Sequence, residues 1–488
     1  MNLRASIILR RAERLPRVNQ LKTWRYCAVC LLVGMVSACV RYHAAPLQPE
    51  RSAVEFAARR LSEIPVRDEL ARVMPQAVAS WPPLEWDRGE LLAVALTQNP
   101  QLAVARAQVK TALSHAITAA ETANPELTLQ SEYARHEPHP WLYGISLNWL
   151  LRSSERRRLD IELARIDTAN ARLQLMEQAW SVRSALSAAL SDWESGRRRL
   201  SLLDRLAEAQ DRLLGLERRR IDAGEDSPSE LLIAQQARIQ IEQQRTELRQ
   251  MLDKAQTAAA RALGLPPQAL DGVKFAWPDW GEPPLVDENR RRETREQALL
   301  TRTDLGEAIG EYAAAEAKLQ QSVARQYPQL VLSPGYYWDH GIAKFPFNVG
   351  FTLPLNRNKG GIAEARAGRE LAGQRMLALQ ADIYGGIVAA ERAEQIARDS
   401  AEAAEQQLEA AKRQRQTTDL GFKLGAADSQ DQVGADILTM RAELEVLQMR
   451  AELQNSRNSL EDALHAPLSG PELALAKTIA SLVPGSGS

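Results

Sequence analysis

Apolar and polar side chains alternate along the segment from Trp141 to Leu151 (WLYGISLNWLL), with large apolar residues at odd positions and mostly small or polar ones at even positions. Successive side chains of a strand point to opposite faces, so this period of two predicts a strand with one apolar face. The pattern recurs from Phe345 to Leu355 (FPFNVGFTLPL). A further predicted strand, opened by a proline, precedes each copy and ends at Tyr133 and at Trp338.

Long helices follow each strand pair. No proline occurs between Pro140 and Pro228, or between Pro354 and Pro467. A helix of roughly 70 residues would be about 100 Å long. From Arg152 to about Asp222, large apolar residues recur every seven positions with one phase slip, which is typical of coiled-coil packing. These residues are Leu159, Ile166, Leu173, Trp180, Leu186, Trp193 and Leu200.

The strands and helices form an internal repeat. Each unit has about 200 residues and is predicted to contain a helix, two strands, a long helix, a break and a further helix. The first unit has shorter helices at about Arg88–Thr122 and Ser229–Leu263. The fold class is therefore α+β and mostly α. We expect a signal peptide, an N-terminal segment, a first repeat, a Pro-rich linker, a second repeat and a tail, at residues 1–38, 39–85, 86–264, 265–294, 295–468 and 469–488.

Composition narrows the function. Charged residues make up 25% of the chain, but its net charge is only −1, so there is no electrostatic case for nucleic-acid binding. Ala, Leu, Glu, Gln and Arg dominate, as expected of long packed helices.

The N-terminus has the features of a lipoprotein signal peptide. Basic residues up to Arg25 precede the apolar run CAVCLLVGMV and then VSAC, which resembles a lipobox ending at Cys39. This pattern predicts cleavage after residue 38 and a diacylglycerol and an N-acyl chain on Cys39; the alternative is an ordinary signal peptide with a chance cysteine. Val40 follows in place of the aspartate associated with inner-membrane retention, which implies sorting to the outer membrane.

The predicted strands suit a membrane. Each has about ten residues, which is enough to cross a bilayer at a tilt. Lipid does not tolerate an open sheet edge, and the smallest membrane barrels have eight strands, whereas this chain offers four. Closure would need a dimer or a trimer. The alternative is two soluble hairpins on a helical body, with exposed aromatics near the strand ends at Tyr133, Trp141, Tyr143, Trp149, Tyr336, Tyr337, Trp338, Phe345 and Phe347.

Together, the lipobox, the duplicated unit, the N-P-x-L motifs at Asn99 and Asn124 and the long helices resemble the TolC-type outer-membrane efflux family over about residues 86–468. The resemblance implies a homotrimer with a twelve-stranded outer-membrane barrel continuous with a periplasmic helical tunnel. It also implies docking onto a periplasmic adaptor and an inner-membrane pump. The shorter helices would stack end to end beside the long ones, and the Pro-rich segment Leu265–Asp287 would pack around the middle.

Each long helix ends in a break with glycine, at Gly224 and at Gly425, and an acid follows six residues later, at Glu230 and at Asp431. Glycine suits a helix end because it accepts positive φ. Ser227 and Glu230 fit a capping box, and Asp428 or Ser429 could cap the last helix.

The resemblance gives these breaks a function. Asp431 matches the first of two acidic positions that ring the periplasmic entrance in the family, and the second is Gly434 here. Asp428 and Glu230 are further candidates for the gate and its cation selectivity, while Gly224 and Gly425 would mark the tips that dock the adaptor.

The sequence contains no recognisable catalytic motif. The six histidines are scattered, and no zinc, phosphate-binding or nucleophile motif occurs. RHEPHP at residues 135–140 is interpreted as a solvated turn, so we expect no enzyme, no metal site and no cofactor besides the lipid. The alternative to an export duct is a lipid-anchored coiled-coil scaffold.

The substrate is suggested only by resemblance. LPLNRNKGGIAEARA, with Asn356, Arg357, Asn358 and Gly361, resembles the CzcC-like branch that partners heavy-metal pumps. It implies export of divalent metal cations with an RND-type pump. Multidrug or solvent efflux and a type I secretion duct remain alternatives.

Overall fold

The computed structural model describes residues 42–63, 66–68, 71, 81–151, 153–225 and 227–473, so the predicted signal peptide and Cys39 lie outside the described residues. The chain divides into two units, residues 1–55 and 56–488, and the boundary falls within helix α2 (Pro49–Ala58). The following description concerns the second unit.

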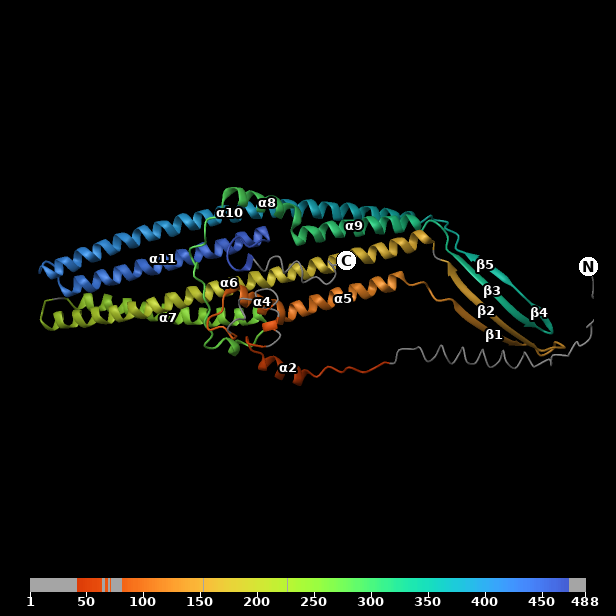
Figure 1. The fold of residues 1–488 in the computed structure, drawn as a ribbon, viewed down its shortest axis with the longest axis horizontal. Coiled ribbons are helices and arrows are strands. Elements are labelled where there is room, and N and C mark those ends of the chain that lie inside the picture. Colours follow the sequence, from red (N-terminus) through yellow and green to blue (C-terminus); the bar gives the residue numbers. More distant parts are fainter. Residues whose placement is uncertain are drawn as a thin grey trace, which may run out of the picture. The chain divides into compact units, whose positions relative to one another are not determined.

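Antiparallel strands form a single sheet at one end of this unit (Figure 1). Strand β2 pairs with β1 on one side and with β3 on the other, so the central β2–β3 pair joins the two repeats. Strands β4 and β5 pair with successive parts of β3 and together form its far neighbour. The strands are β1 (Glu126–Tyr133), β2 (Trp141–Leu151), β3 (Leu330–Asp339), β4 (Ile342–Lys344) and β5 (Phe347–Phe351).

The predicted strand Phe345–Leu355 is wrong at both ends. Only Phe347–Phe351 pairs with β3, and Leu353 and Leu355 lie beyond the strand. Proline has no N–H to donate to a ladder, so Pro346 separates β5 from β4 and Pro354 excludes the residues after β5. The carbonyl oxygen of Pro346 still accepts the Gly335 N–H at 2.9 Å, which keeps the two short strands in line.

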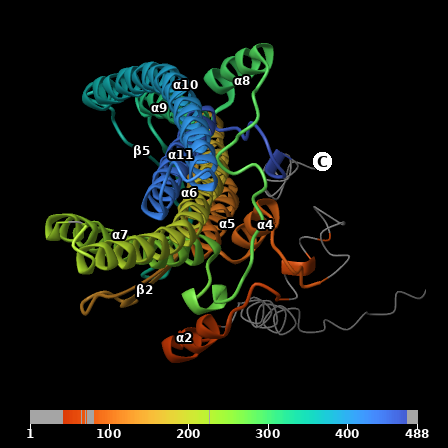
Figure 2. The same ribbon diagram turned by 90° about the vertical axis from the view of Figure 1, so that its left-hand side faces the viewer.

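Two long helices organise the rest, as predicted. Helices α6 and α10 have 69 and 65 residues, about 100 Å each. Helix α6 contacts α5, α7, α9 and α11, and α10 contacts α9 and α11. Figure 2 shows the α6–α7 and α10–α11 hairpins with their connections facing the viewer. The helices are α4 (Arg88–Gln98), α5 (Pro100–Ala120), α6 (Ser154–Asp222), α7 (Pro228–Leu263), α8 (Glu288–Thr301), α9 (Thr303–Ala324), α10 (Lys359–Lys423) and α11 (Ser429–Leu464), with the 3-10 helix η2 (Pro267–Leu270).

The predicted helix Arg88–Thr122 is in fact two helices that meet at Asn99. Pro100 disfavours helical backbone at the residue before it, and Asn99 is accordingly extended (φ −63°, ψ 124°). Its side-chain oxygen caps α5 by accepting the N–H of Gln101 at 2.8 Å, while its Nδ2 donates to the Ala262 carbonyl at 2.8 Å. This contact confirms the predicted end-to-end stacking, because it joins the start of α5 to the end of α7.

The second repeat repeats the arrangement. Arg302, directly before α9, donates a hydrogen bond to the carbonyl of Ala463 near the end of α11. Thr303 Oγ1 lies 3.4 Å from Nδ1 of His465, the residue that follows α11. Helix α9 therefore stacks on α11 as α5 stacks on α7.

The Pro-rich linker packs against the middle of the long helices, as predicted. Trp277 and Trp280 are buried in the largest hydrophobic cluster, together with residues of α4, α6 and α7. The Trp280 Nε1–H donates to Ser191 on α6 at 3.4 Å, and the Gly281 N–H donates to Gln454 on α11 at 3.4 Å. One linker segment thus contacts both repeats.

Candidate functional site

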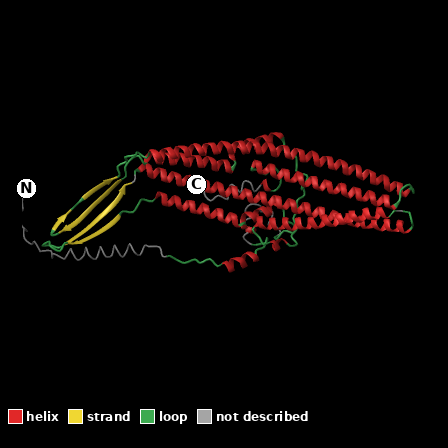
Figure 3. Cartoon of the chain, turned by 180° about the vertical axis from the view of Figure 1, so that it is seen from behind, coloured by secondary structure: helices red, strands yellow, loops and turns green. Residues whose placement is uncertain are grey.

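The apolar face of the sheet is exposed. On β2, Trp141, Tyr143, Ile145 and Trp149 each expose between 41% and 51% of their surface. On β1 and β5, Leu129, Tyr133, Phe347, Val349 and Phe351 expose between 49% and 74%. Figure 3 shows the helices gathered at one end of the strands. An exposed apolar surface of this size is expected to be covered by lipid or by another protein surface.

Both predicted helix-tip glycines end their helices in the left-handed conformation. Gly224 has φ +75° after α6, and Gly425 has φ +73° after α10. No other atom lies within 4 Å of the position of a Cβ at either glycine, so backbone conformation and not space explains the residue type. The structure confirms the breaks; adaptor docking remains a prediction.

Asp428 and Asp431 form a capping box at the start of α11. The Asp428 carboxylate accepts the N–H groups of Gln430 and Asp431, both at 2.8 Å, and the Asp431 carboxylate accepts the Asp428 N–H at 2.9 Å. The cap predicted for Asp428 is confirmed. Asp431 is therefore a capping residue in this conformation, and its place in a gate stays a prediction.

The capping box predicted at the start of α7 is wrong. Ser227 Oγ accepts the N–H of Ser229 at 3.1 Å, while the N–H of Glu230 bonds to the Ser227 backbone carbonyl at 3.2 Å. Pro228 at the first helical position already lacks an N–H, and the side chain satisfies the next donor instead. Glu230 is exposed at this tip.

Arg220 connects the two hairpins at their tips. From the last turn of α6 its guanidinium donates to Asp428 at 2.7 Å and to the side-chain oxygen of Gln430 at 2.9 Å. The backbone N–H groups of Asp431 and Gln430, together with Arg220, hold the pKa of Asp428 below its ordinary value. Sequence reasoning missed Arg220, because a basic residue in a last helical turn reads as a simple match to the helix dipole.

A polar cleft of about 600 Å³ lies beside this contact. Thr418 and Gln414 of α10 and Gly434 of α11 are among the residues that line it. The tip thus places one arginine and two carboxylates around an open polar cleft.

A buried ion network joins the repeats farther along α6. The Arg183 side chain is 2% exposed, and its guanidinium bonds to the carboxylate of Glu461 on α11 and to that of Glu472 at 2.7 Å. Arg88 at the start of α4 lies 3.9 Å from Glu472. Burial alone would lower the pKa of Arg183, but the two carboxylates raise it above its ordinary value.

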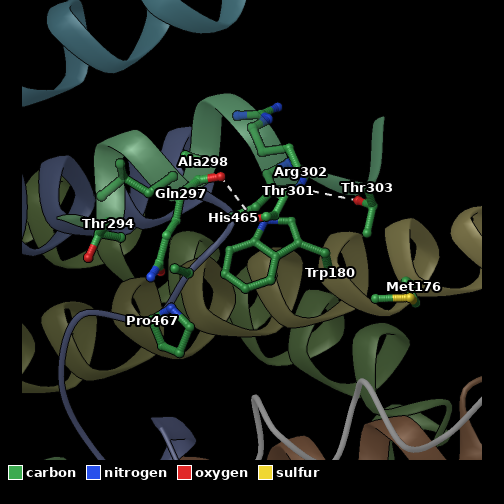
Figure 4. Close-up of a pocket in the computed structure, with 12 residues that line it drawn as sticks. Met176, Trp180, Thr294, Gln297, Ala298, Thr301, Arg302, Thr303, His465 and Pro467 are labelled. Atoms are coloured by element: carbon green, nitrogen blue, oxygen red, sulfur yellow. Dashed lines mark hydrogen bonds between the residues drawn. The ribbon is translucent and has the colours of Figure 1, made fainter. Parts of the chain in front are cut away.

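A cavity of about 210 Å³ lies where α9 stacks on α11 (Figure 4). The His465 ring stacks on Trp180, with centroids 5.4 Å apart. Burial and the nearby Arg302 cation lower the pKa of His465 to about 4, against the opposing pull of Asp304. His465 is therefore neutral at pH 7, and its 3.6 Å approach to Glu177 is not an ion pair.

Metal and membrane-helix features can be stated for the described residues alone. There, no group of three or more His, Cys, Asp or Glu side chains has an arrangement fit for a metal ion. Within the same part of the chain, every helix is too short or too polar to cross a bilayer. The segment Asn356–Asn358 is a turn into α10, in which Arg357 and Asn358 have φ of +48° and +51°.

Comparison with known proteins gives the lineage. The family model described as "Outer membrane efflux protein" matches residues 91–265 and 294–465. A comparison with curated proteins finds no significant match.

Solved structures share the fold. The outer membrane protein VceC of Vibrio cholerae is 15% identical, with a TM-score of 0.63 over 78% of this chain and 97% of that one. The CmeC outer membrane channel of Campylobacter jejuni is 14% identical, with a TM-score of 0.65 over 81% and 88%. The MtrE outer membrane channel of Neisseria gonorrhoeae, in its open state, is 17% identical, with a TM-score of 0.61 over 78% and 89%.

The family match covers most of the chain, and the fold agrees with the resemblance seen in the sequence. The chain therefore belongs to the outer membrane efflux protein family, whose members are TolC-like outer-membrane channels with a large periplasmic helical portion.

Proposed function

We propose that three copies of this chain close a twelve-stranded barrel and act as the passive outer-membrane duct of a tripartite efflux system. The observation that carries the proposal is the sheet, with an exposed apolar face and unpaired edges at β1 and at β4–β5. A sheet in lipid must close, and one copy supplies too few strands. Dimer and trimer both satisfy that arithmetic, and membership of the family favours the trimer.

The repeats support a specific seam between copies. Within the first repeat, Leu127 pairs with Leu147. At the equivalent positions of the second, Leu330 pairs with Phe351. The two hairpins therefore have the same internal register, and a copy can add its first hairpin to the second hairpin of a neighbour as the two hairpins add to each other within a chain.

The register of that seam follows. Within the chain, Ile145 of β2 pairs with Tyr336 of β3. Val349 of β5 is the repeat equivalent of Ile145, and Tyr133 of β1 is the equivalent of Tyr336. The proposal therefore pairs Val349 of one copy with Tyr133 of the next.

The helix tips would form the gate. In a trimer, three copies of Asp431 would converge on the axis and favour cations. The Arg220–Asp428 pair would hold the two hairpins of each chain together in the resting state, supported by the 2.7 Å contact. An adaptor that engages the tips near Gly224 and Gly425 could compete for these contacts.

Divalent heavy metals are the proposed substrate, with an RND-type pump and a lipid-anchored Cys39. Support is limited to the Asn356–Asn358 segment, and Asn358 uses its Nδ2 to bond the Ser322 carbonyl at 2.9 Å, which is a turn contact. This segment supports a relationship to that branch of the family and carries no information about which substrate is recognised. A passive duct needs no catalytic residues, and the proposal therefore agrees with a sequence in which no catalytic motif was found.

Two measurements test the proposal. The purified protein should give discrete single-channel steps in planar bilayers, with cation preference reduced by Asp431→Ala. A deletion strain should become sensitive to Zn, Co, Cd, Ni, Cu or Ag salts. Absence of steps would refute the duct, while sensitivity to dyes, antibiotics or detergents alone would assign it to multidrug efflux.

A further inference from the structure

Basic side chains gather where the helices meet the sheet. We call this set the cationic collar. Arg156, Arg157 and Arg158 lie in the first turns of α6, Arg325 directly follows α9, and Arg357 and Lys359 lie at the start of α10. In this group only Arg156 is partly buried, and the rest are exposed. Figure 3 shows these helix ends adjoining the strands.

Most of the collar is not neutralised by acids. Arg156 donates to the carbonyls of Ala324 at 3.1 Å and Tyr327 at 2.7 Å, and Arg157 donates to that of Ala120 at 2.7 Å. A carbonyl carries only a partial charge, so these contacts orient the guanidinium groups but do not neutralise their positive charge.

Ion pairs reinforce the contrast. Arg158 pairs with Glu155 and Glu162, both of them exposed. Among the described residues, no carboxylate lies within ion-pair distance of the other five collar cations. Arg325 instead donates to the side-chain oxygen of Gln321 at 3.2 Å.

The local charge balance differs from that of the whole chain. Among the described residues, five of the six collar cations have no acid partner, and the two carboxylates that pair with the sixth, Arg158, are Glu155 and Glu162. The full sequence, by contrast, has a net charge of −1. Both repeats contribute, so a closed oligomer would carry the charge around its whole circumference.

The collar borders the exposed apolar face. Trp149 is 50% exposed and Phe351 is 59% exposed, and they lie near the ends of β2 and β5 that lead into α6 and α10. If the apolar face spans the membrane, the next level on the helical side is the headgroup layer of the periplasmic leaflet. Basic residues immediately beside a membrane span favour anionic headgroups.

We propose that the cationic collar binds anionic phospholipid headgroups of the periplasmic leaflet. This inference rests on the proposed function, because it needs the sheet to lie in the membrane. Guanidinium groups bind phosphate oxygens in bidentate fashion, and Lys359 adds a point charge. The lipid would fix the height of the barrel independently of any anchor on Cys39.

The test compares two variants with the same change in charge. The collar variant is Arg157→Gln, Arg325→Gln, Arg357→Gln and Lys359→Gln, and it keeps Arg156, which holds the end of α9. The control carries Gln at exposed arginines far from the collar, namely Arg249, Arg290, Arg292 and Arg413. Each protein is reconstituted in nanodiscs of mixed phosphatidylglycerol and phosphatidylcholine, and the lipids retained after detergent extraction are counted by native mass spectrometry.

Wild type and control should retain phosphatidylglycerol preferentially. In the collar variant this preference should fall by at least roughly tenfold, because each cation near an anionic surface strengthens binding about fivefold (about 1 kcal/mol). Equal retention by both variants would overturn the inference. Equal retention of phosphatidylglycerol and phosphatidylcholine by the wild type would overturn it too, because the collar would then not select anionic lipid. Channel steps recorded from the same samples keep the tests apart: if steps persist with unchanged lipid retention, only this inference fails.

Discussion

Removal of the Arg183 guanidinium should cost more stability than any exposed ion pair in the chain. Arg183→Met keeps a side chain of similar length and leaves Glu461 and Glu472, buried at 2% and 4% exposure, without their main cation. Breaking one partner of a buried ion network costs about 3–5 kcal/mol, because the remaining charge has lost both water and its partner. Arg88, 3.9 Å from Glu472, retains part of the compensation, so the lower end of that range is expected.

The assay is thermal unfolding followed by far-UV circular dichroism in one detergent at one scan rate. At roughly 1 °C per kcal/mol for a chain of this length, the expected fall in apparent Tm is about 3 °C. Arg205→Met is the matched control, since its ion pair with Glu443 has side chains 58% and 30% exposed. Its loss should stay below about 1 kcal/mol.

A rescue variant separates lost charge from lost packing. Adding Glu461→Gln and Glu472→Gln to Arg183→Met removes the unpaired charges and should recover much of the fall in Tm. The reasoning is refuted if Arg183→Met and Arg205→Met unfold at the same temperature, or if the triple variant recovers nothing.

Further predictions concern the stacked helices and the tip. Asn99→Ala should lower stability by about 1–2 kcal/mol, measured by the same assay, because the α5 cap and the bond to Ala262 are both lost; an unchanged Tm would contradict this. The pKa of His465 is about 4 in the folded chain against an ordinary 6.5. The contribution of His465 to stability should therefore be complete above pH 6.5, fall by at most about 3 kcal/mol as the pH drops toward 4, and then stay constant. His465→Gln should flatten this part of the stability profile. Asp428→Ala should speed hydrogen exchange at the start of α11 through loss of a cap worth about 1 kcal/mol, whereas Glu230→Ala should not.

Periodicity predicted the elements that depend on local pattern. Alternation located β2 to the residue, and the proline-free heptad run located α6 to within two residues at its start. It failed where one residue type overrides a pattern. Pro346 and Pro354 shorten the last strand although the alternation continues through both, and Asn99 with Pro100 divides an otherwise regular helical run.

Long-range pairing was beyond the sequence. Arg183 and Glu472 are 289 positions apart, and Arg220 and Asp428 are 208 apart, so nothing in local spacing singles out either pair. At the helix tips, the sequence identified the acidic residues but not their interactions. A carboxylate six residues after a glycine is equally consistent with a helix cap and with a gate residue. The structure shows Asp428 and Asp431 capping α11, while Ser227 caps α7 through Ser229 instead of Glu230.

The central claim is that copies of this chain close a barrel through the edges of their sheets. The most direct measurement is disulfide cross-linking in outer membranes of a variant with Val349→Cys and Tyr133→Cys. Cβ atoms of directly paired antiparallel residues lie about 4.5–5.5 Å apart, close enough for an engineered disulfide to form with a small shift. Oxidation should give a covalent trimer on a denaturing gel, and far less with Val349→Cys and Ser131→Cys, which is two positions out of register. Monomers alone, or equal yields from both variants, would contradict the account.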